Sequence, residues 1–209
     1  MILTSPRLTD GQRIPPEFAF CIPHPTRHVA LSQNRNPPLI WREVPEGTRS
    51  LALLCVDPDV PSVGDDVNRP DRTVPADLPR ADFYHWVLVD LPPSLNGVEE
   101  GAFSKQVTPR GKTGPAAPLG ARQGLNDYTG WFARDQDMRG EYFGYDGPCP
   151  PWNDAREHRY RFTVYALNVD SLPVQGGFTG PQALAAMEGH ILAQASLTVT
   201  YTLNPALLG

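Results

Sequence analysis

Apolar and polar side chains alternate with a period of two along much of the chain, which is the pattern of half-buried β-strands. In residues 159–167 the side chains of Tyr160, Phe162 and Val164 share one expected face, which also carries His158. Residues 50–56 are nearly all apolar, as is typical of a central strand buried on both faces. We expect strands in five segments: residues 38–42, 50–56, 84–89, 159–167 and 196–203.

One segment has the helical period instead. A helix is expected from Thr179 through Gln194, because Pro181 can take the first helical position and an apolar stripe follows it. Residues 62–80 and 108–127 are rich in proline, glycine and charge without any period, so we expect long surface loops there.

Strands scattered along the chain with one late helix predict a mainly β protein. The expected architecture is an antiparallel β-sandwich with a C-terminal α-helix and short helical additions. A length of 209 residues suits one large domain, and no linker interrupts the chain, so residues 1–209 are expected to form a single domain.

Composition and charge limit the classes of partner and the location that we expect for this protein. The 18 basic and 23 acidic residues give a net charge of −5 and are well mixed, so no basic stripe indicates nucleic acid. No stretch approaches the roughly 18 apolar residues of a membrane span, and the N-terminal residues lack the apolar core of a signal peptide. Cys21, Cys55 and Cys149 show no metal or redox spacing and are expected to be reduced thiols. These features predict a cytoplasmic location.

A proline-stiffened loop leads into the strand at 159–167. It reads Gly-Pro-Cys-Pro-Pro from Gly147 onward and delivers His158 onto a face that is otherwise apolar. Glycine lets the backbone approach a ligand closely, and proline lowers the entropy cost of holding that approach. A histidine at the mouth of an apolar face is either a satisfied core residue or part of a site.

Two further segments carry matching chemistry. Asp57 and Asp59 follow the buried strand in an Asp-Pro-Asp-Val-Pro turn. His85 begins the next strand and is expected to share a face with Val87 and Val89. Together with the Gly-Pro loop, these segments predict a small pocket rich in hydrogen-bond donors, which suits an oxyanion such as phosphate or carboxylate.

Asp57 is a carboxylate acceptor in a set that consists mainly of donors. It is expected either to orient a histidine and favour its charged form, or to accept a proton from a phosphate monoester. The alternative is purely structural: Asp57 caps a turn, and His85 packs in the core.

Four segments taken together resemble the phosphatidylethanolamine-binding proteins, also called Raf kinase inhibitor-like proteins, with the closest match to their bacterial branch. These segments are 57–61 (Asp-Pro-Asp-Val-Pro), 85–87 (His-Trp-Val), 147–151 (Gly-Pro-Cys-Pro-Pro) and 158–160 (His-Arg-Tyr). Weaker matches extend the resemblance over nearly the whole chain. The sequence departs from the family pattern at 152–154, where Trp-Asn-Asp replaces the usual Lys-Gly.

The resemblance implies antiparallel Greek-key sheets with a C-terminal helix, and a pocket for phosphate, acetate-like ions or a phosphoethanolamine head group. Carried over position by position, it assigns to the pocket Asp57, His85, Gly147, Pro148, His158 and Tyr160, with Asp59, Cys149 and Trp86 in second rank. By analogy within the family, a kinase or protease partner and a homodimer are further expectations. An exposed apolar strip for self-association is expected at Trp131, Phe132, Tyr142 and Phe143.

The expected function is therefore non-catalytic binding of a small anion, without a cofactor. A hydrolase is one alternative, but no Gly-x-Ser-x-Gly elbow occurs, and Cys149 is the only candidate nucleophile. A metal site is another, since the pocket residues include ligand types, although no paired-histidine spacing supports it. Its candidate ligands are Asp57, Asp59, His85 and His158.

Overall fold

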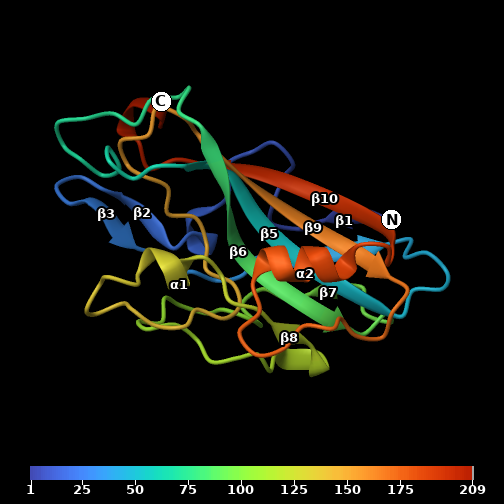
Figure 1. The fold of residues 1–209 in the computed structure, drawn as a ribbon. Coiled ribbons are helices and arrows are strands. Elements are labelled where there is room, and N and C mark those ends of the chain that lie inside the picture. Colours follow the sequence, from blue (N-terminus) through green and yellow to red (C-terminus); the bar gives the residue numbers. More distant parts are fainter. Residues whose placement is uncertain (209) are drawn as a thin grey trace.

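Antiparallel β-strands dominate the computed structural model, which describes residues 1–208 (Figure 1). The main sheet has five strands in the order β10-β9-β5-β6-β8. Their bounds are β5 Ser50–Pro61, β6 Arg80–Leu91, β8 Arg122–Gln123, β9 His158–Leu167 and β10 Ile191–Tyr201. Two smaller sheets hold β1 Ile2–Thr4, β4 Leu39–Arg42 and β7 Gly97–Val98, and β2 Cys21–His24 with β3 His28–Leu31. The helices are α1 Tyr128–Trp131 and α2 Gly180–Met187, with 3₁₀ turns at Pro16–Phe18, Pro118–Gly120 and Pro205–Leu207.

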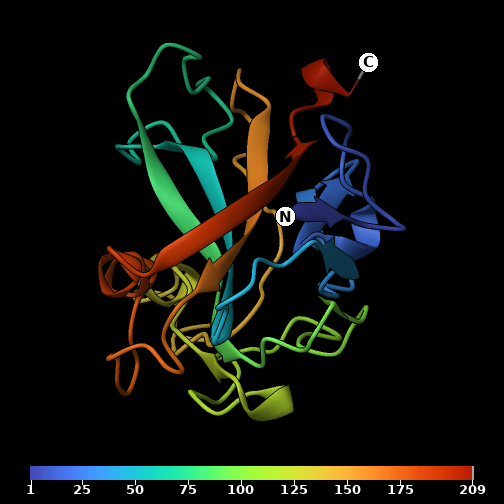
Figure 2. The same cartoon turned by 90° about the vertical axis from the view of Figure 1, so that its right-hand side faces the viewer.

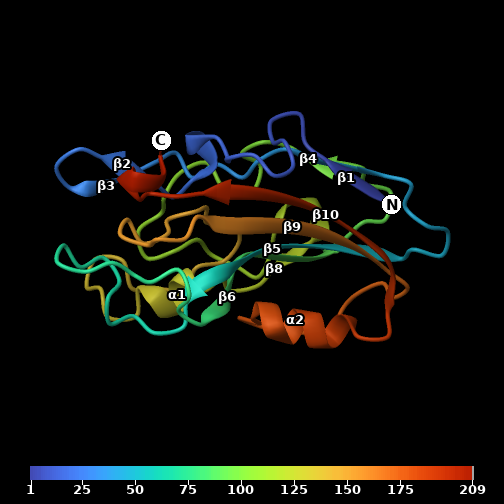
Figure 3. The same cartoon turned by 90° about the horizontal axis from the view of Figure 1, so that it is seen from above.

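The central strand β5 separates two hydrophobic cores. Leu51, Leu53 and Cys55 face one core, which the N-terminal sheets cover, and the alternate residues face a second core under α2. Figure 3 shows α2 on one side of the main sheet and the N-terminal strands on the other. Both faces of β5 are buried, which explains its continuous apolar sequence. The prediction of a mainly β sandwich with a C-terminal helix is confirmed.

The helix α2 begins where the sequence predicts but ends earlier. The side chains of Thr179 and Gln182 form a capping box at its start. The predicted continuation to Gln194 is wrong, because the chain turns at Gly189, which has a φ of +77°, and β10 begins at Ile191. From there the apolar residues pair with β9 rather than continuing the helical stripe. Pairing with a neighbouring strand therefore overrides local helix preference.

Two irregularities in the pairing of β5 with β6 lie close to the candidate residues. Cys55 pairs with Trp86 and Val56 pairs with Tyr84, so His85 is an extra residue without a partner. Such a bulge reverses the alternation of faces. The expectation that His85 shares a face with Val87 and Val89 is therefore wrong, since those valines pack in the core under α2. A second register shift lies between Asp57 and Val60.

The long loop 62–79, the loop before β9 and the C-terminal turn lie at one end of the main sheet (Figure 2). Residues 62–79, which follow β5, contact the loop before β9 through a bridge between Val74 and Asp154. The C-terminal turn joins them, because the side-chain amide of Asn204 donates to the backbone carbonyl of Asp154. The segment 108–127 is less irregular than expected, since it contains the short strand β8.

The expected exposed aromatic strip is not formed. Tyr142 and Phe143 are buried, and Phe132 is partly buried in the first core, so only Trp131 is exposed. A self-association surface on these four residues is therefore not available. No helix within residues 1–208 has both the length and the apolar character that crossing a membrane requires.

Candidate functional site

The strand order of the main sheet brings the candidate residues together. Because β5 lies antiparallel to both β6 and β9, its C-terminal end is next to the first residues of those two strands. Asp57 comes from β5, His85 from β6, and His158 and Tyr160 from β9. All four line one cavity of about 200 Å³.

The walls of this pocket are largely apolar. Besides the four residues just named, they are formed by Val60, Pro61, Gly64, Val67, Phe83, Tyr128, Trp131, Cys149, Pro150 and Pro151. Gly64 and Val67 belong to the long loop after β5, and Trp131 lies half exposed. The polar groups thus lie on the sheet, and aromatic and aliphatic side chains surround them.

Gly147 and Pro148 lie outside the pocket wall and have structural roles. The Gly147 amide donates to Oδ1 of Asn34 at 2.7 Å, and its carbonyl accepts from the Tyr128 hydroxyl at 2.7 Å. A Cβ at this position would lie 2.0 Å from the Phe18 carbonyl oxygen, so only glycine fits. The Pro148 carbonyl accepts backbone hydrogen bonds from the β2 region. These contacts fix the loop that carries Cys149 to the pocket.

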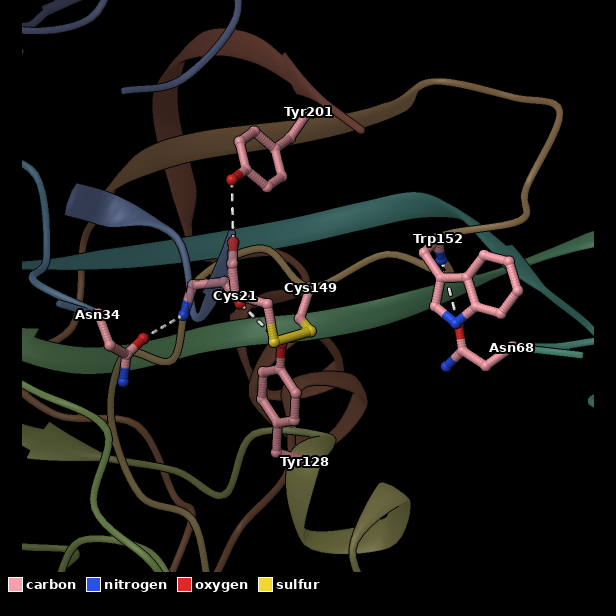
Figure 4. Close-up of a disulfide and its surroundings, with 8 residues drawn as sticks. Cys21, Asn34, Asn68, Tyr128, Cys149, Trp152 and Tyr201 are labelled. Carbon is pink, nitrogen blue, oxygen red and sulfur yellow. Dashed lines mark hydrogen bonds between the residues drawn. A yellow bond between two sulfur atoms is a disulfide. The ribbon is translucent and has the colours of Figure 1, made fainter. Parts of the chain in front are cut away.

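Cys149 is bonded to Cys21 in a disulfide that closes 128 residues of chain (Figure 4). The expectation of three reduced thiols is therefore wrong for this pair, while Cys55 is free and buried. Spacing along the sequence cannot reveal a pair so far apart, because the fold alone brings β2 against the pocket loop. Disulfides are typical of oxidising compartments, so the cysteines no longer support a reducing one.

His158 is held between two buried carboxylates. Its Nδ1 lies 2.7 Å from Oδ2 of Asp57, and its Nε2 lies 3.1 Å from Oδ2 of Asp154. Burial alone would lower the pKa of the imidazole, but the two carboxylates outweigh it and raise the pKa to about 9. His158 is therefore a charged imidazolium at neutral pH, with both ring N–H groups engaged. Of the two roles expected for Asp57, it takes the first.

Arginine side chains complete the charge pairing behind the pocket. Arg80, itself buried, binds both carboxylate oxygens of Asp154. Asp59 accepts from the guanidinium and the backbone amide of Arg159, and also from Arg156. Burial favours the neutral acid at Asp59, but the Arg159 hydrogen bonds outweigh it and hold its pKa below the ordinary value. Asp59 thus anchors the turn and does not line the cavity.

His85 is held in one tautomer. Its Nδ1 lies 2.7 Å from the carbonyl oxygen of Asp146, which can only accept, so Nδ1 carries the proton. Burial lowers the pKa of His85, against the opposing effects of Asp57 and the Asp146 carbonyl. Its other nitrogen, Nε2, takes part in no hydrogen bond within residues 1–208. Trp86, the neighbouring second-rank candidate, points into the first core, where its indole N–H donates to Gln123.

The Tyr160 hydroxyl is the one fully buried side-chain polar atom with no partner within hydrogen-bond distance among the described residues 1–208. Burial raises its pKa, and so does the nearby carboxylate of Asp57, which lies beyond that distance. Its ring lies 5.1 Å from that of His85, centroid to centroid, in an edge-to-face arrangement. Native proteins pair nearly all buried polar groups, so an exception in a pocket wall points to a missing ligand or water.

Several supporting residues have no signal in the sequence. Asp146 lies behind His85, and its buried carboxylate accepts from Asn34, Asn126 and Lys112. Asp154, which binds His158, falls in the segment where the chain departs from the family pattern. The wall residues Phe83 and Tyr128 come from the start of β6 and from the four-residue helix α1. Only the folded chain brings these positions together.

A metal site has no geometric support. Within residues 1–208, no group of three or more His, Cys, Asp or Glu side chains is arranged to hold a metal ion. Asp57, Asp59 and His158 already bind one another or arginine side chains, as described above.

Comparison with known proteins gives a consistent result. The family profile described as phosphatidylethanolamine-binding protein matches residues 4–202. A UPF0098 protein of Methanothermobacter thermautotrophicus is 34% identical over 177 residues, covering 85% of this chain and 89% of that protein. The UPF0098 protein YbhB of Escherichia coli is 30% identical over 202 residues, covering 97% of this chain and all of YbhB.

Solved structures agree with the sequence comparison. The crystal structure of Escherichia coli YbcL, whose title describes it as a new member of the mammalian PEBP family, has a TM-score of 0.68 at 25% identity and covers 96% of this chain and 97% of its own. The structure of a Chlamydia trachomatis protein, titled as a homologue of phosphatidylethanolamine-binding protein, has a TM-score of 0.63 at 32% identity, with 95% of each chain covered. The architecture is thus shared over nearly the full length of each protein.

Proposed function

The chain belongs to the phosphatidylethanolamine-binding protein family, and from this premise we propose that it is a non-catalytic protein that binds a small anionic group in the pocket between β5, β6 and β9. The ligand class is a phosphate or carboxylate group, such as a phosphoethanolamine head group. One observation carries the proposal: the Tyr160 hydroxyl is buried in the pocket wall without a partner. An unpaired buried hydroxyl costs about 1–3 kcal/mol, which a ligand oxygen would recover.

The size of the pocket supports a head group rather than a whole lipid. At about 200 Å³ the cavity is smaller than the roughly 300–1,000 Å³ of typical small-molecule sites. The polar groups lie on the sheet, and Val60, Val67 and Trp131 lie among the apolar wall residues. A compact oxyanion would fit against the sheet, with any attached carbon chain along those apolar side chains.

The state of His158 argues against turnover. A general base needs a free nitrogen and a pKa near the operating pH. His158 has neither, because both nitrogens bind carboxylates and its pKa is raised to about 9. Cys149, the only candidate nucleophile of the hydrolase alternative, is in a disulfide, so it offers no thiolate. These features remove His158 and Cys149 as catalytic groups, which supports binding without catalysis.

Regulation of a kinase or protease, a homodimer and a cytoplasmic location stay predictions by analogy or from the sequence. The prediction of location rested partly on reduced cysteines, and the disulfide between Cys21 and Cys149 removes that support.

Replacing Tyr160 by phenylalanine tests the proposal, because the change removes only the unpartnered oxygen. Titrations with inorganic phosphate, phosphoethanolamine, glycerophosphoethanolamine and acetate are followed by the NMR shifts of the histidine rings. A hydrogen bond to a charged group contributes about 1.5–3 kcal/mol, so we expect Tyr160→Phe to weaken binding by about 10- to 150-fold. Glycerophosphoethanolamine carries the phosphate diester of a lipid head group, whereas phosphoethanolamine is a monoester. The ratio of the two affinities therefore distinguishes a lipid head group from a free phosphate monoester as the ligand.

Tyr165→Phe is the matched control, since Tyr165 lies on the opposite face of β9, against the core under α2. Tyr165→Phe should leave the affinity for every probe unchanged. The NMR signals of the His190 ring, which lies outside the pocket and is hydrogen-bonded to Asn168, should not shift when a probe is added. The proposal fails if no probe moves the His85 ring at millimolar concentration, or if Tyr160→Phe binds as tightly as the wild type.

A further inference from the structure

We propose that the pocket binds its ligand together with one proton, which is shared between a ligand oxygen and Nε2 of His85. The ligand class is then an oxyacid in its protonated form, or an oxyanion whose binding takes up a proton from solution. This inference rests on the proposed function and concerns the same pocket.

The hydrogen bond behind His85 fixes which of its two ring nitrogens carries the proton. The carbonyl oxygen of Asp146 can only accept, so Nδ1 of His85 is the donor, and the neutral ring presents a lone pair at Nε2. The amide of Asp146 also donates to the His85 carbonyl at 3.0 Å, so the two segments are bonded in both directions. A fully deprotonated oxygen placed against Nε2 would meet a lone pair. A proton between the two atoms turns that repulsion into a hydrogen bond.

The positive charges near the pocket are already paired with carboxylates. Among residues 1–208, no lysine or arginine lines the cavity. The one cation in the wall, His158, is neutralised by Asp57 on one side and Asp154 on the other. The nearby arginines bind buried carboxylates, as in the Arg80–Asp154 pair. A dianion would therefore lose its hydration without gaining a free cation, which is costly, whereas a protonated ligand carries less charge.

The groups that face the His85 ring oppose one another. They are Asp57 in β5, Tyr128 in α1, Asp146 in the loop before Gly147, and His158 and Tyr160 in β9. In the free protein burial outweighs the two carboxylates and favours neutral His85. An anion within hydrogen-bond distance of Nε2 adds a further opposite charge and favours the imidazolium. Ligand and proton therefore bind cooperatively, whichever atom holds the proton more tightly.

The pH dependence of phosphoethanolamine binding tests this inference. A phosphate monoester has its second pKa near 6. Well above that pH, the fraction of the monoester that still carries this proton therefore falls about tenfold for each pH unit. We expect the association constant of the wild type to fall close to tenfold between pH 7 and pH 8. Calorimetry in buffers of different ionisation enthalpy should give an uptake near one proton at pH 8. Glycerophosphoethanolamine cannot bring a proton itself, so at pH 7.5 its binding should also take up one, at His85.

The variant His85→Gln separates this mechanism from a general loss of binding. Its amide N–H can donate to a deprotonated oxygen, so the variant should still bind, but with an association constant that changes less than about twofold between pH 7 and pH 8. His190→Gln, outside the pocket, should keep the wild-type pH dependence.

Two results would overturn the inference, and they differ in whether the proposed anion binding is refuted as well. Wild-type binding of constant strength from pH 6.5 to 8.5 refutes the shared proton but leaves the anion pocket intact. Absence of binding at every pH refutes the proposed function and this inference with it.

Discussion

Raising the pH should weaken the fold through His158, and the size of the effect follows from its surroundings. The imidazole is fully buried, and the carboxylates of Asp57 and Asp154 raise its pKa from 6.5 to about 9 in the folded protein. At about 1.4 kcal/mol for each tenfold difference, this corresponds to roughly 3 kcal/mol of stability. Because the folded pKa lies above the unfolded one, the contribution is complete below pH 6.5 and is lost as the pH rises through about 9.

Urea denaturation at intervals from pH 6 to pH 9.5 measures this loss as a fall in the free energy of unfolding. The buried Cys55 thiol also has a raised pKa and weakens the fold in the upper part of this range. The informative quantity is therefore the difference between the wild type and His158→Gln at each pH. We expect that difference to shrink by about 3 kcal/mol between pH 6 and pH 9.5.

His190→Gln, with its single partner Asn168, is the matched control and should give a nearly constant difference from the wild type. His158→Gln leaves the buried carboxylate of Asp57 without its cation, while Asp154 keeps Arg80, so the variant should lose about 3–5 kcal/mol near neutral pH. If that variant does not fold, an NMR titration of the wild-type His158 ring gives its pKa directly. A ring that titrates near 6.5, or a difference that stays flat with pH, would refute the ion-pair argument.

Two further predictions concern the elements that support the pocket. Asp59→Asn should cost about 1.5–3 kcal/mol in urea denaturation, because it removes a buried charged acceptor from the hydrogen bonds of Arg159, whose own side chain is more than half exposed. The exposed Asp71→Asn should cost less than about 1 kcal/mol, and equal losses for the two variants would contradict this difference. Reduction of the disulfide between Cys21 and Cys149 should lower the free energy of unfolding by about 2–5 kcal/mol, because the bond closes a loop of 128 residues. Mass spectrometry after alkylation checks the pairing, since both cysteines should react only after reduction, and labelling of either one before reduction would contradict the bond.

The sequence predicts those features that depend on local periodicity. The alternation in β9 correctly indicates that His158, Tyr160 and Phe162 share a buried face. The apolar run in β5 correctly indicates a strand buried on both sides, because each face of β5 meets its own core. These patterns reflect contacts that recur at fixed spacing along one strand.

Features that arise from pairing between distant segments could not be predicted. The bulge at His85 depends on how β6 pairs with β5, and it moves the imidazole to the face opposite to Val87. The second partner of His158, Asp154, lies in a loop whose conformation is fixed by contacts with residues 62–79. The sequence indicates a pocket with two histidines. Only the structure shows that the imidazolium of His158 is already paired with two carboxylates, and that Nε2 of His85 offers a lone pair.

A crystal structure of the protein with phosphoethanolamine at saturating concentration tests the central claim most directly. The account predicts a phosphate oxygen about 2.5–3.2 Å from the Tyr160 hydroxyl, with a second within the same range of Nε2 of His85. Phosphate density in the separate hollow lined by His28 and Trp152, with the Tyr160 hydroxyl still unpaired, would contradict it.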